Sequence, residues 1–269
     1  MLTPKTETPR GIIQPRAVPR PFSVARWLAP PRLAHSLAHV WRVRWSLEEG
    51  AEFVQHTLPH PMVHVVFEGD AGEVVGPIPR RFERRLVGRG QVLGLAFRPA
   101  TFRALSDAPL LSLRDRRVPL RGFFSSASAR AVAVARELAA LADEEARVEL
   151  VCAWLSEHVP EQLPAPLVEL RELVERLARD DSITSVEAAA RLAGCSVRTL
   201  QRRFDDAIGW SPRQVIRRRR IHEALAQLDA ARPPDLASLA AQLGYCDQAH
   251  LSRDFKAMTG VTPGAYLRR

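Results

Sequence analysis

The last third of the sequence contains an internal repeat, and this feature limits the possible fold more than any other. Two stretches align at an interval of 51 residues. Because the shared apolar positions recur three and four residues apart, the repeat indicates a duplicated helical unit. The identical pairs are Ala189 and Ala240, Leu192 and Leu243, Cys195 and Cys246, Leu200 and Leu251, Arg202 and Arg253, Phe204 and Phe255, Gly209 and Gly260, and Pro212 and Pro263.

Residues that favour helix N-termini keep the same register. They pair as Thr184 with Asp235, Ser196 with Asp247, and Ser211 with Thr262. Each precedes a helical run, so the repeat also predicts where the helices begin. Each copy then consists of a short helix, a turn of about three residues and a second helix, which is a helix-turn-helix. We expect the helices at 186–192 and 197–207 in the first copy, and at 236–243 and 248–258 in the second.

A long helix is predicted between the copies. Ser211 followed by Pro212 is a favourable helix start, and the apolar pattern runs to about Leu228. A helix of roughly 17 residues spans about 25 Å. It could hold two DNA-reading units apart by about one turn of B-DNA, near 34 Å. The arginine run 217–220 fills one turn, so at least one of its side chains must pack against protein.

The second helix of each copy has a buried stripe and a polar face. In the first copy Leu200 and Phe204 share the stripe, while Arg198 and Arg202 lie opposite it. The second copy buries Leu251 and exposes a matching polar face. Arg, Gln and Ser at such positions suit hydrogen bonds to base edges in the major groove.

Several motifs resemble the DNA-binding domain of the AraC/XylS family of transcription regulators. They are the stretch 196–204, the Gly-Trp-Ser-Pro that ends at Pro212, the stretch 244–256, and the Gly-Val-Thr-Pro that ends at Pro263. The resemblance covers about 168–269. It implies two helix-turn-helix units joined by a long helix, with each recognition helix in the major groove of double-stranded DNA. By position, the base-contacting sites of the family fall on Arg198, Gln201, Arg202, Gln248, Ala249, Ser252 and Arg253.

Two of these sites depart from a simple pattern. Ala249 stands where a polar residue is frequent in the family, so the second unit is expected to contact fewer bases. The helical wheel puts Gln248 close to the packed stripe, and only the resemblance favours it as a base contact. Phosphate contacts are predicted for Ser196, Arg218, Arg219 and Lys256.

The first half of the chain is strand-like. Alternating or β-branched runs occur at 40–45, 62–67 and 91–97, separated by turn residues, and a short helix is expected at 32–38. Helical periodicity dominates after Ser125. The predicted fold class is therefore α+β, with a β-rich N-terminal domain and an all-α C-terminal domain. We expect a disordered lead-in at 1–31, a β-rich regulatory domain with C-terminal helices at 32–159, a proline-rich linker at 160–166 and the DNA-binding domain at 167–269.

Composition excludes some classes of protein. No stretch approaches the roughly 18 apolar residues of a membrane span, and no signal-peptide pattern is present at the N-terminus. An odd number of cysteines, three, argues against a disulfide framework, so a cytoplasmic location is expected. The net charge of +9 and the pI near 10.7 are compatible with a polyanionic partner without locating its site.

No catalytic set, cofactor or metal site is predicted. His56, His60 and His64 recur every four residues, but Pro59 and Pro61 make a single regular strand through them improbable. Arginines at 80–89 indicate a solvated strand face or, alternatively, a site for an anionic effector or the DNA backbone.

Some AraC/XylS members carry an N-terminal sensor or dimerisation domain, often a β-barrel, and 40–102 is similar in position and texture. The resemblance thus adds two candidate partners, a small-molecule effector at the N-terminal domain and a second copy in a homodimer. Two alternative functions stay open: an enzyme in the N-terminal domain that the helical half targets to DNA, and a nonspecific architectural DNA binder.

Overall fold

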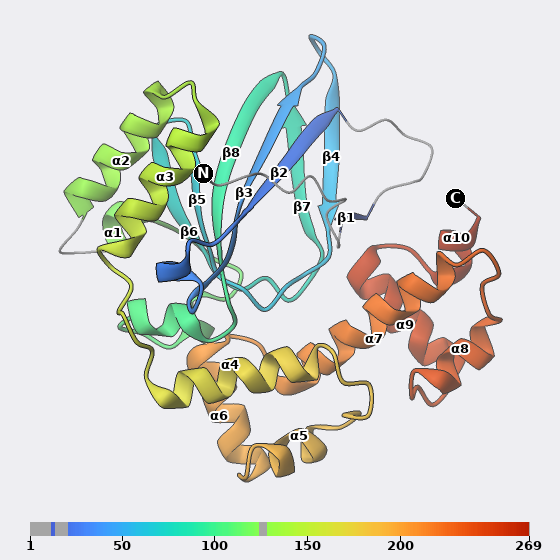
Figure 1. Ribbon diagram of the computed structural model, residues 1–269. Helices are drawn as coiled ribbons and strands as arrows, with labels where there is room; N and C mark the ends of the chain where they lie inside the picture. The colour runs from blue at the N-terminus through green and yellow to red at the C-terminus, as the bar shows by residue number, and fades with distance from the viewer. Residues whose placement is uncertain (1–11, 14–20, 124–127, 269) are drawn as a thin grey trace.

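The computed structural model describes residues 12–13, 21–123 and 128–268 and has a β-rich part followed by a helical part (Figure 1). This is the predicted α+β class. The strands form two antiparallel sheets, ordered β2-β3-β8-β5-β6-β9 and β1-β4-β7. The larger sheet contains β2 (Phe22–Leu28), β3 (Leu37–Ser46), β8 (Arg89–Phe97), β5 (His64–Glu68), β6 (Ala71–Val75) and β9 (Arg117–Pro119). The smaller contains β1 (Ile12–Ile13), β4 (Glu52–Thr57) and β7 (Phe82–Val87).

The expectation of a disordered lead-in is wrong for residues 22–28. They form strand β2, which pairs along its whole length with β3, and Trp27 is 2% exposed. The prolines of this segment flank the strand at Pro21 and Pro30 and do not interrupt it. The rest of the predicted lead-in, 1–11 and 14–20, lies outside the described residues.

The helix expected at 32–38 is also wrong. A short 3₁₀ helix, η1 (Pro31–Leu33), ends before β3 begins at Leu37. Leu37 pairs with Phe97 of β8 and is fully buried. The pairing partner lies 60 residues away in sequence, so local periodicity could not reveal it.

Three helices cover one face of the larger sheet: α1 (Leu120–Phe123), α2 (Ser128–Ala140) and α3 (Glu144–Ser156) (Figure 1). One core contact joins Trp154 of α3 to Phe67 of β5, with ring centroids 5.7 Å apart. After α3 the chain has no helix until α4 (Ala165–Leu177), with Pro164 at its N-cap. The predicted interruption of helical structure by the prolines is thus confirmed, although α4 begins inside the expected linker.

The helical part contains the predicted repeat. The first unit pairs α5 (Val186–Leu192) with α6 (Val197–Ala207), and the second pairs α8 (Leu236–Gln242) with α9 (Gln248–Thr259). Helix α7 (Pro212–Leu228) joins them, and α10 (Pro263–Leu267) follows the second unit. None of the helices in the described part of the chain is long and apolar enough to cross a membrane.

The helix caps explain these boundaries. Ser196 and Asp247 accept hydrogen bonds from backbone N–H groups in the first turns of α6 and α9. Ser211 and Gln214 form a capping box at α7, and Thr262 caps α10. The expectation for Thr184 is wrong by one position. Ser185 caps α5 instead, since the helix begins at Val186.

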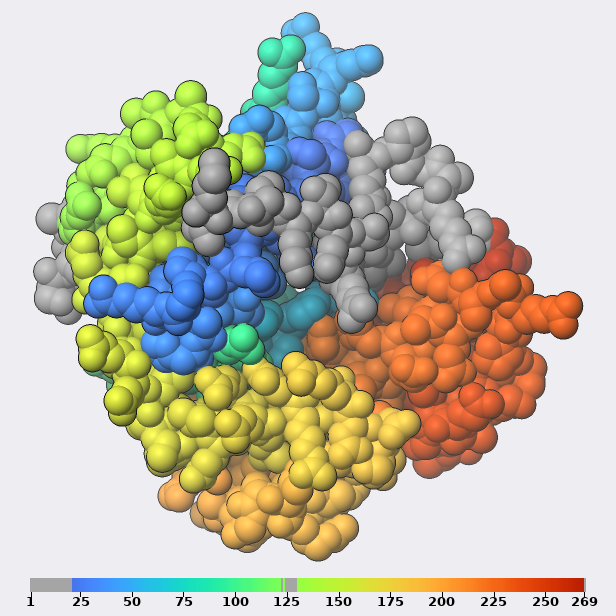
Figure 2. Space-filling view, viewed as in Figure 1, coloured from blue at the N-terminus to red at the C-terminus, as the bar shows by residue number. Residues whose placement is uncertain are grey.

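Each helical unit has its own core, and each core is completed by a residue of the sheet half. Ala100 belongs to the cluster that contains Leu200 and Phe204, whereas Leu58 belongs to the cluster that contains Leu251 and Phe255. Figure 2 shows the helices from α4 onward, yellow to red, packed directly against the sheet half. The helical part therefore packs against the sheet half and is not joined to it by a linker alone.

Two equivalent glycines mark the places where the sheet half meets the two units. A Cβ added at Gly209 would lie 2.8 Å from the Leu110 carbonyl oxygen, in the 3₁₀ helix η3 (Leu110–Leu113). A Cβ added at Gly260 would collide with the Arg81 guanidinium. Both glycines have positive φ, +72° and +86°.

Replacing glycines one at a time should separate backbone strain from packing. Gly194 also has positive φ (+60°) but faces open space, so Gly194→Ala should cost about 1 kcal/mol through backbone strain alone. Gly209→Ala should cost at least about 1 kcal/mol more, because its Cβ also displaces Leu110. Urea unfolding of the two variants measures this difference, and equal losses would contradict the tight contact between η3 and the first unit.

Candidate nucleic-acid interface

The polar face of α6 projects from the first helix-turn-helix. Leu200 and Phe204 are fully buried and fix the rotation of the helix, so Arg198 and Arg202 are exposed. The side chain of Ser196 accepts a hydrogen bond from the Thr199 backbone N–H at 3.1 Å, which sets where the helix begins. The first unit thus presents two guanidinium groups one turn apart, as predicted.

Gln201 lies at the edge of this face and is half-buried. Its Nε2 donates to Asp205 Oδ1 at 3.0 Å. Because a carboxamide nitrogen carries two protons, one donor remains, and the side chain is held in one orientation.

The second unit presents a less charged face on α9. Gln248, Ala249 and Arg253 are exposed, and Ser252 is half-buried. Gln248 is the first residue of the helix, so its side chain lies beyond the packed stripe that begins at Leu251. The helical-wheel objection to Gln248 therefore does not hold in the structure. Lys256 is exposed in the last turn of α9.

Two of the predicted phosphate contacts are engaged elsewhere. Arg219 is 9% exposed, and its Nη2 donates to the carbonyl oxygens of Asp181 and Ile183 at 3.4 Å each. This burial contradicts a phosphate contact for Arg219. Arg218 Nε donates to the carbonyl of Pro59 in the sheet half, and burial lowers the pKa of Arg218 to about 10. This arrangement does not favour a phosphate contact for Arg218 either.

All four arginines of the run on α7 in fact bind protein. Arg217 forms an ion pair with Asp254 of α9 at 3.1 Å. Arg220 donates to the Thr184 carbonyl at 2.9 Å and lies over the Tyr245 ring, 5.3 Å from its centroid. At least one arginine of this run was expected to pack against protein, and all four do. The charged side chains of this run therefore hold the helical part together through hydrogen bonds and an ion pair.

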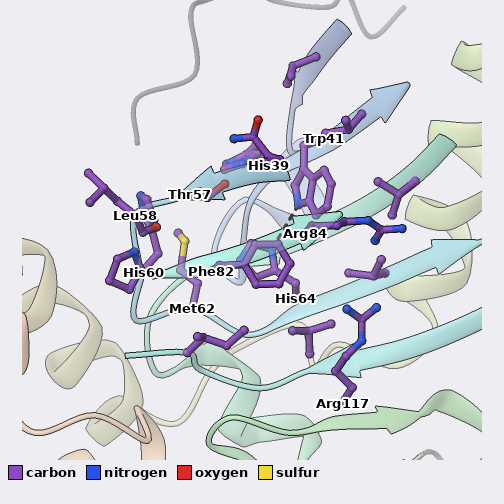
Figure 3. A pocket seen from close by; sticks show the side chains of 18 of the residues that line it. His39, Trp41, Thr57, Leu58, His60, Met62, His64, Phe82, Arg84 and Arg117 are labelled. Carbon is purple, nitrogen blue, oxygen red and sulfur yellow. Dashed lines mark hydrogen bonds between the residues drawn. The ribbon is translucent and has the colours of Figure 1, made fainter. Parts of the chain in front are cut away.

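A cavity of roughly 230 Å³ between the two sheets is a second candidate site (Figure 3). The sequence does not reveal this cavity, because alternation shows which side chains face inward but not whether they fill the space between two sheets. Its walls include Trp41, Trp45 and Phe82, together with His39, His60 and His64.

The regularly spaced histidines do not form a metal site. His56 lies on β4 near Glu83, His60 lies in the following loop and His64 begins β5. Among the residues that the structure describes, no group of three His, Cys, Asp or Glu side chains could hold a metal ion.

The arginines at 80–89 divide between several roles. Arg85 is exposed and pairs with Glu52, as on a solvated strand face. Arg84 points inward, lines the cavity and lies over Trp45, with Glu68 as its ion-pair partner. Arg81 bridges to the Thr259 carbonyl of the second helical unit.

Comparisons with known proteins match both halves of the chain. Residues 189–269 match a helix-turn-helix domain family, and residues 25–119 match a domain of unknown function, DUF6597. Among solved structures, ToxT from Vibrio cholerae is 12% identical, with a TM-score of 0.37 over 92% of this chain and 97% of that one. An apo variant of ToxT from strain SCE256 is 11% identical, with a TM-score of 0.41 over 85% and 97% of the two chains. ToxT bound to an unsaturated fatty acid gives 12% identity and a TM-score of 0.33 over 91% and 94%.

The structural role of Arg219 can be tested by Arg219→Met. The variant leaves the Asp181 and Ile183 carbonyls without their charged donor, so the free energy of unfolding should fall by about 2 kcal/mol. Arg213→Met, at an exposed arginine in the first turn of the same helix, is the matched control and should change it little. Urea denaturation provides the measurement. Small, equal effects of the two substitutions would show that Arg219 is not a structural donor.

Proposed function

We propose that the chain acts in the cytoplasm as a sequence-specific transcription regulator of the AraC/XylS type, which places α6 and α9 in the major groove of double-stranded DNA. The helix-turn-helix family match over 189–269 supports this proposal. The observation that carries this proposal is the pair of recognition helices, each capped at its N-terminus and each exposing polar side chains above a buried aromatic anchor, Phe204 or Phe255. The proposed mechanism is binding alone, with no catalytic step.

In the first unit we assign base contacts to Arg198, Gln201 and Arg202. A guanidinium can donate two parallel hydrogen bonds to guanine O6 and N7, and a carboxamide can pair with adenine N6 and N7. The exposure of both arginines and the fixed orientation of Gln201 support this assignment.

In the second unit we assign base contacts to Gln248, Ala249, Ser252 and Arg253. Ala249 offers only a methyl group, which suits contact with the methyl group of thymine. With one guanidinium in place of two, this unit should contribute less discrimination than the first. Ser196 and Lys256, beside the N-terminus of α6 and in the last turn of α9, are the proposed phosphate contacts.

We propose that residues 32–159 regulate the DNA-binding residues 167–269, with strand β2 (Phe22–Leu28) added to the regulatory part. A small-molecule effector in the cavity between the sheets is the second proposed partner. A second copy of the chain is the third, and analytical ultracentrifugation with and without operator DNA would test it.

Selection of bound sites from a random duplex pool tests the central proposal. The wild type should return a motif with two parts, one for each recognition helix. Recovery of no motif, with equal affinity for scrambled duplex, would instead support an architectural DNA binder.

Arg202→Ala should weaken binding to the selected site by about 1 to 3 kcal/mol and relax the preference at one base pair. Arg179→Ala removes another exposed arginine, outside both recognition helices, and is the matched control. Repeating the site selection with each variant gives the measurement. An unchanged motif for Arg202→Ala would remove this residue from the base contacts.

Lys256→Ala should weaken binding to all sequences alike. Because one phosphate contact contributes about 0.9 to the slope of log affinity against log salt, the variant should flatten that slope by about this amount. Titrations from 50 to 200 mM salt, on the selected site and on scrambled duplex, would measure it. A slope equal to that of the wild type would mean that Lys256 touches no phosphate.

A further inference from the structure

Helix α6 carries a carboxylate on the side that is proposed to face DNA. Asp205 follows Gln201 by four residues and Arg198 by seven, so the three side chains lie along one side of the helix. The equivalent position of the second unit is Lys256, a proposed phosphate contact. Because DNA phosphates repel a carboxylate, an acidic side chain at this place on a recognition helix needs a specific explanation.

The interactions of Asp205 narrow the possible explanations. Within the described part of the chain, Asp205 forms no ion pair, and its side chain accepts a hydrogen bond from Gln201 Nε2 at 3.0 Å. The neighbouring Asp206, in contrast, forms an ion pair with Arg103 of the sheet half. Asp205 therefore does not help to join the two halves, and the partner that it holds is a proposed base contact.

The bond between Asp205 and Gln201 determines which groups of the glutamine remain available. An ionised carboxylate only accepts hydrogen bonds, so the amide nitrogen of Gln201, and not its oxygen, must face Asp205. Because the carboxylate repels the amide oxygen, the N–H that points away from this oxygen is the one donated. The groups left over are Oε1 and the second N–H, side by side on one edge of the amide. Both residues are half-buried, which strengthens the bond that holds this orientation.

The remaining edge of Gln201 complements adenine and not guanine. In the major groove adenine presents an acceptor at N7 and a donor at N6, whereas guanine presents acceptors at both N7 and O6. An acceptor beside a donor pairs with both groups of adenine but sets Oε1 against guanine O6. A glutamine without a partner can instead turn its NH2 group toward both acceptors of guanine, so a free side chain would discriminate less between the two bases.

We propose that Asp205 is a positioning residue that makes the first unit prefer adenine over guanine at the base pair read by Gln201. This inference rests on the proposed function, in which Gln201 contacts a base, and adds the group that decides which base is chosen. The second unit has Ser252 and Lys256 at the equivalent positions and cannot form the same pair.

Binding of the full chain to two duplexes tests the base preference. Both contain the selected site, and they differ only in whether adenine or guanine occupies the base pair at which Gln201→Ala relaxes the preference. In fluorescence anisotropy the wild type should bind the adenine duplex at least about fivefold more tightly. Equal affinity for the two duplexes, selection of any base other than adenine at that pair, or no effect of Gln201→Ala on any base pair overturns the inference.

Asp205→Leu removes the acceptor and keeps a residue that favours helix. It should reduce the preference for adenine to less than about twofold, because the released carboxamide can then also donate to guanine. Glu172→Leu, which removes an exposed carboxylate of α4, is the matched control and should leave the preference unchanged. Circular dichroism confirms that each variant is folded.

The ratio of the two affinities separates positioning from other roles of Asp205. Loss of a negative charge alone would strengthen binding to both duplexes alike, and loss of a structural contact would weaken both alike. Either result, with the preference for adenine unchanged in Asp205→Leu, overturns the proposal.

The double variant Gln201→Ala with Asp205→Leu tests whether Asp205 acts through Gln201. Once the amide is gone, Asp205→Leu should cause no further change in the relative affinity for the two duplexes. A further change would mean that Asp205 contacts a base itself and would overturn the positioning role. A wild-type chain that selects no site refutes the proposed function, whereas a chain that selects a site but keeps its adenine preference in Asp205→Leu refutes this inference alone.

Discussion

The arginine run on α7 is the interaction on which the arrangement of the whole molecule depends. Its four successive guanidiniums bind Asp254 of α9, the Pro59 carbonyl and the backbone carbonyls of 181–184 ahead of α5, and the last of them also lies over the Tyr245 ring. One helical turn thus connects both helix-turn-helix units to each other and to the sheet half. Guanidinium suits this role because its donors fan out in a plane and can reach separate acceptors, which an ammonium group does less well.

Burial makes the hydrogen bonds of Arg218 and Arg219 especially important for stability. Backbone carbonyls at the ends of loops need donors when they are covered. A charged donor gives a stronger bond than a neutral one. From sequence alone, two of these arginines, Arg218 and Arg219, were predicted to contact DNA phosphates. Their positions show that a basic run beside a helix-turn-helix can serve to assemble the domain.

Features that depend on interactions between residues close in sequence could be predicted, whereas features that depend on residues far apart in sequence could not. The helices from α5 to α9 were predictable almost to the residue, because caps such as Ser196 and Asp247 and buried positions such as Phe204 act within a few residues. Strand β2 was not, because its stability comes from pairing with β3, and its flanking prolines resemble those of an unstructured segment. The burial of Arg219 depends on loop carbonyls that come near it only in the folded chain. The candidate base contacts were identified by local periodicity and by resemblance. The cavity, in contrast, depends on how two sheets, built from strands far apart in sequence, face each other.

The contacts at Gly209 and Gly260 have a consequence for the DNA that the protein can recognise. These glycines occupy the same position in the two copies of the repeat, and the sheet half touches both, through Leu110 and Arg81. The separation and relative twist of the two recognition helices are therefore set twice, once by the length of α7 and once by the rigid body that spans the two glycines. The distance and angle between the two recognition helices are therefore fixed. With the DNA contacts proposed above, this geometry should favour operators with one spacing between their two half-sites, so an inserted base pair should weaken binding even when every contacted base is kept.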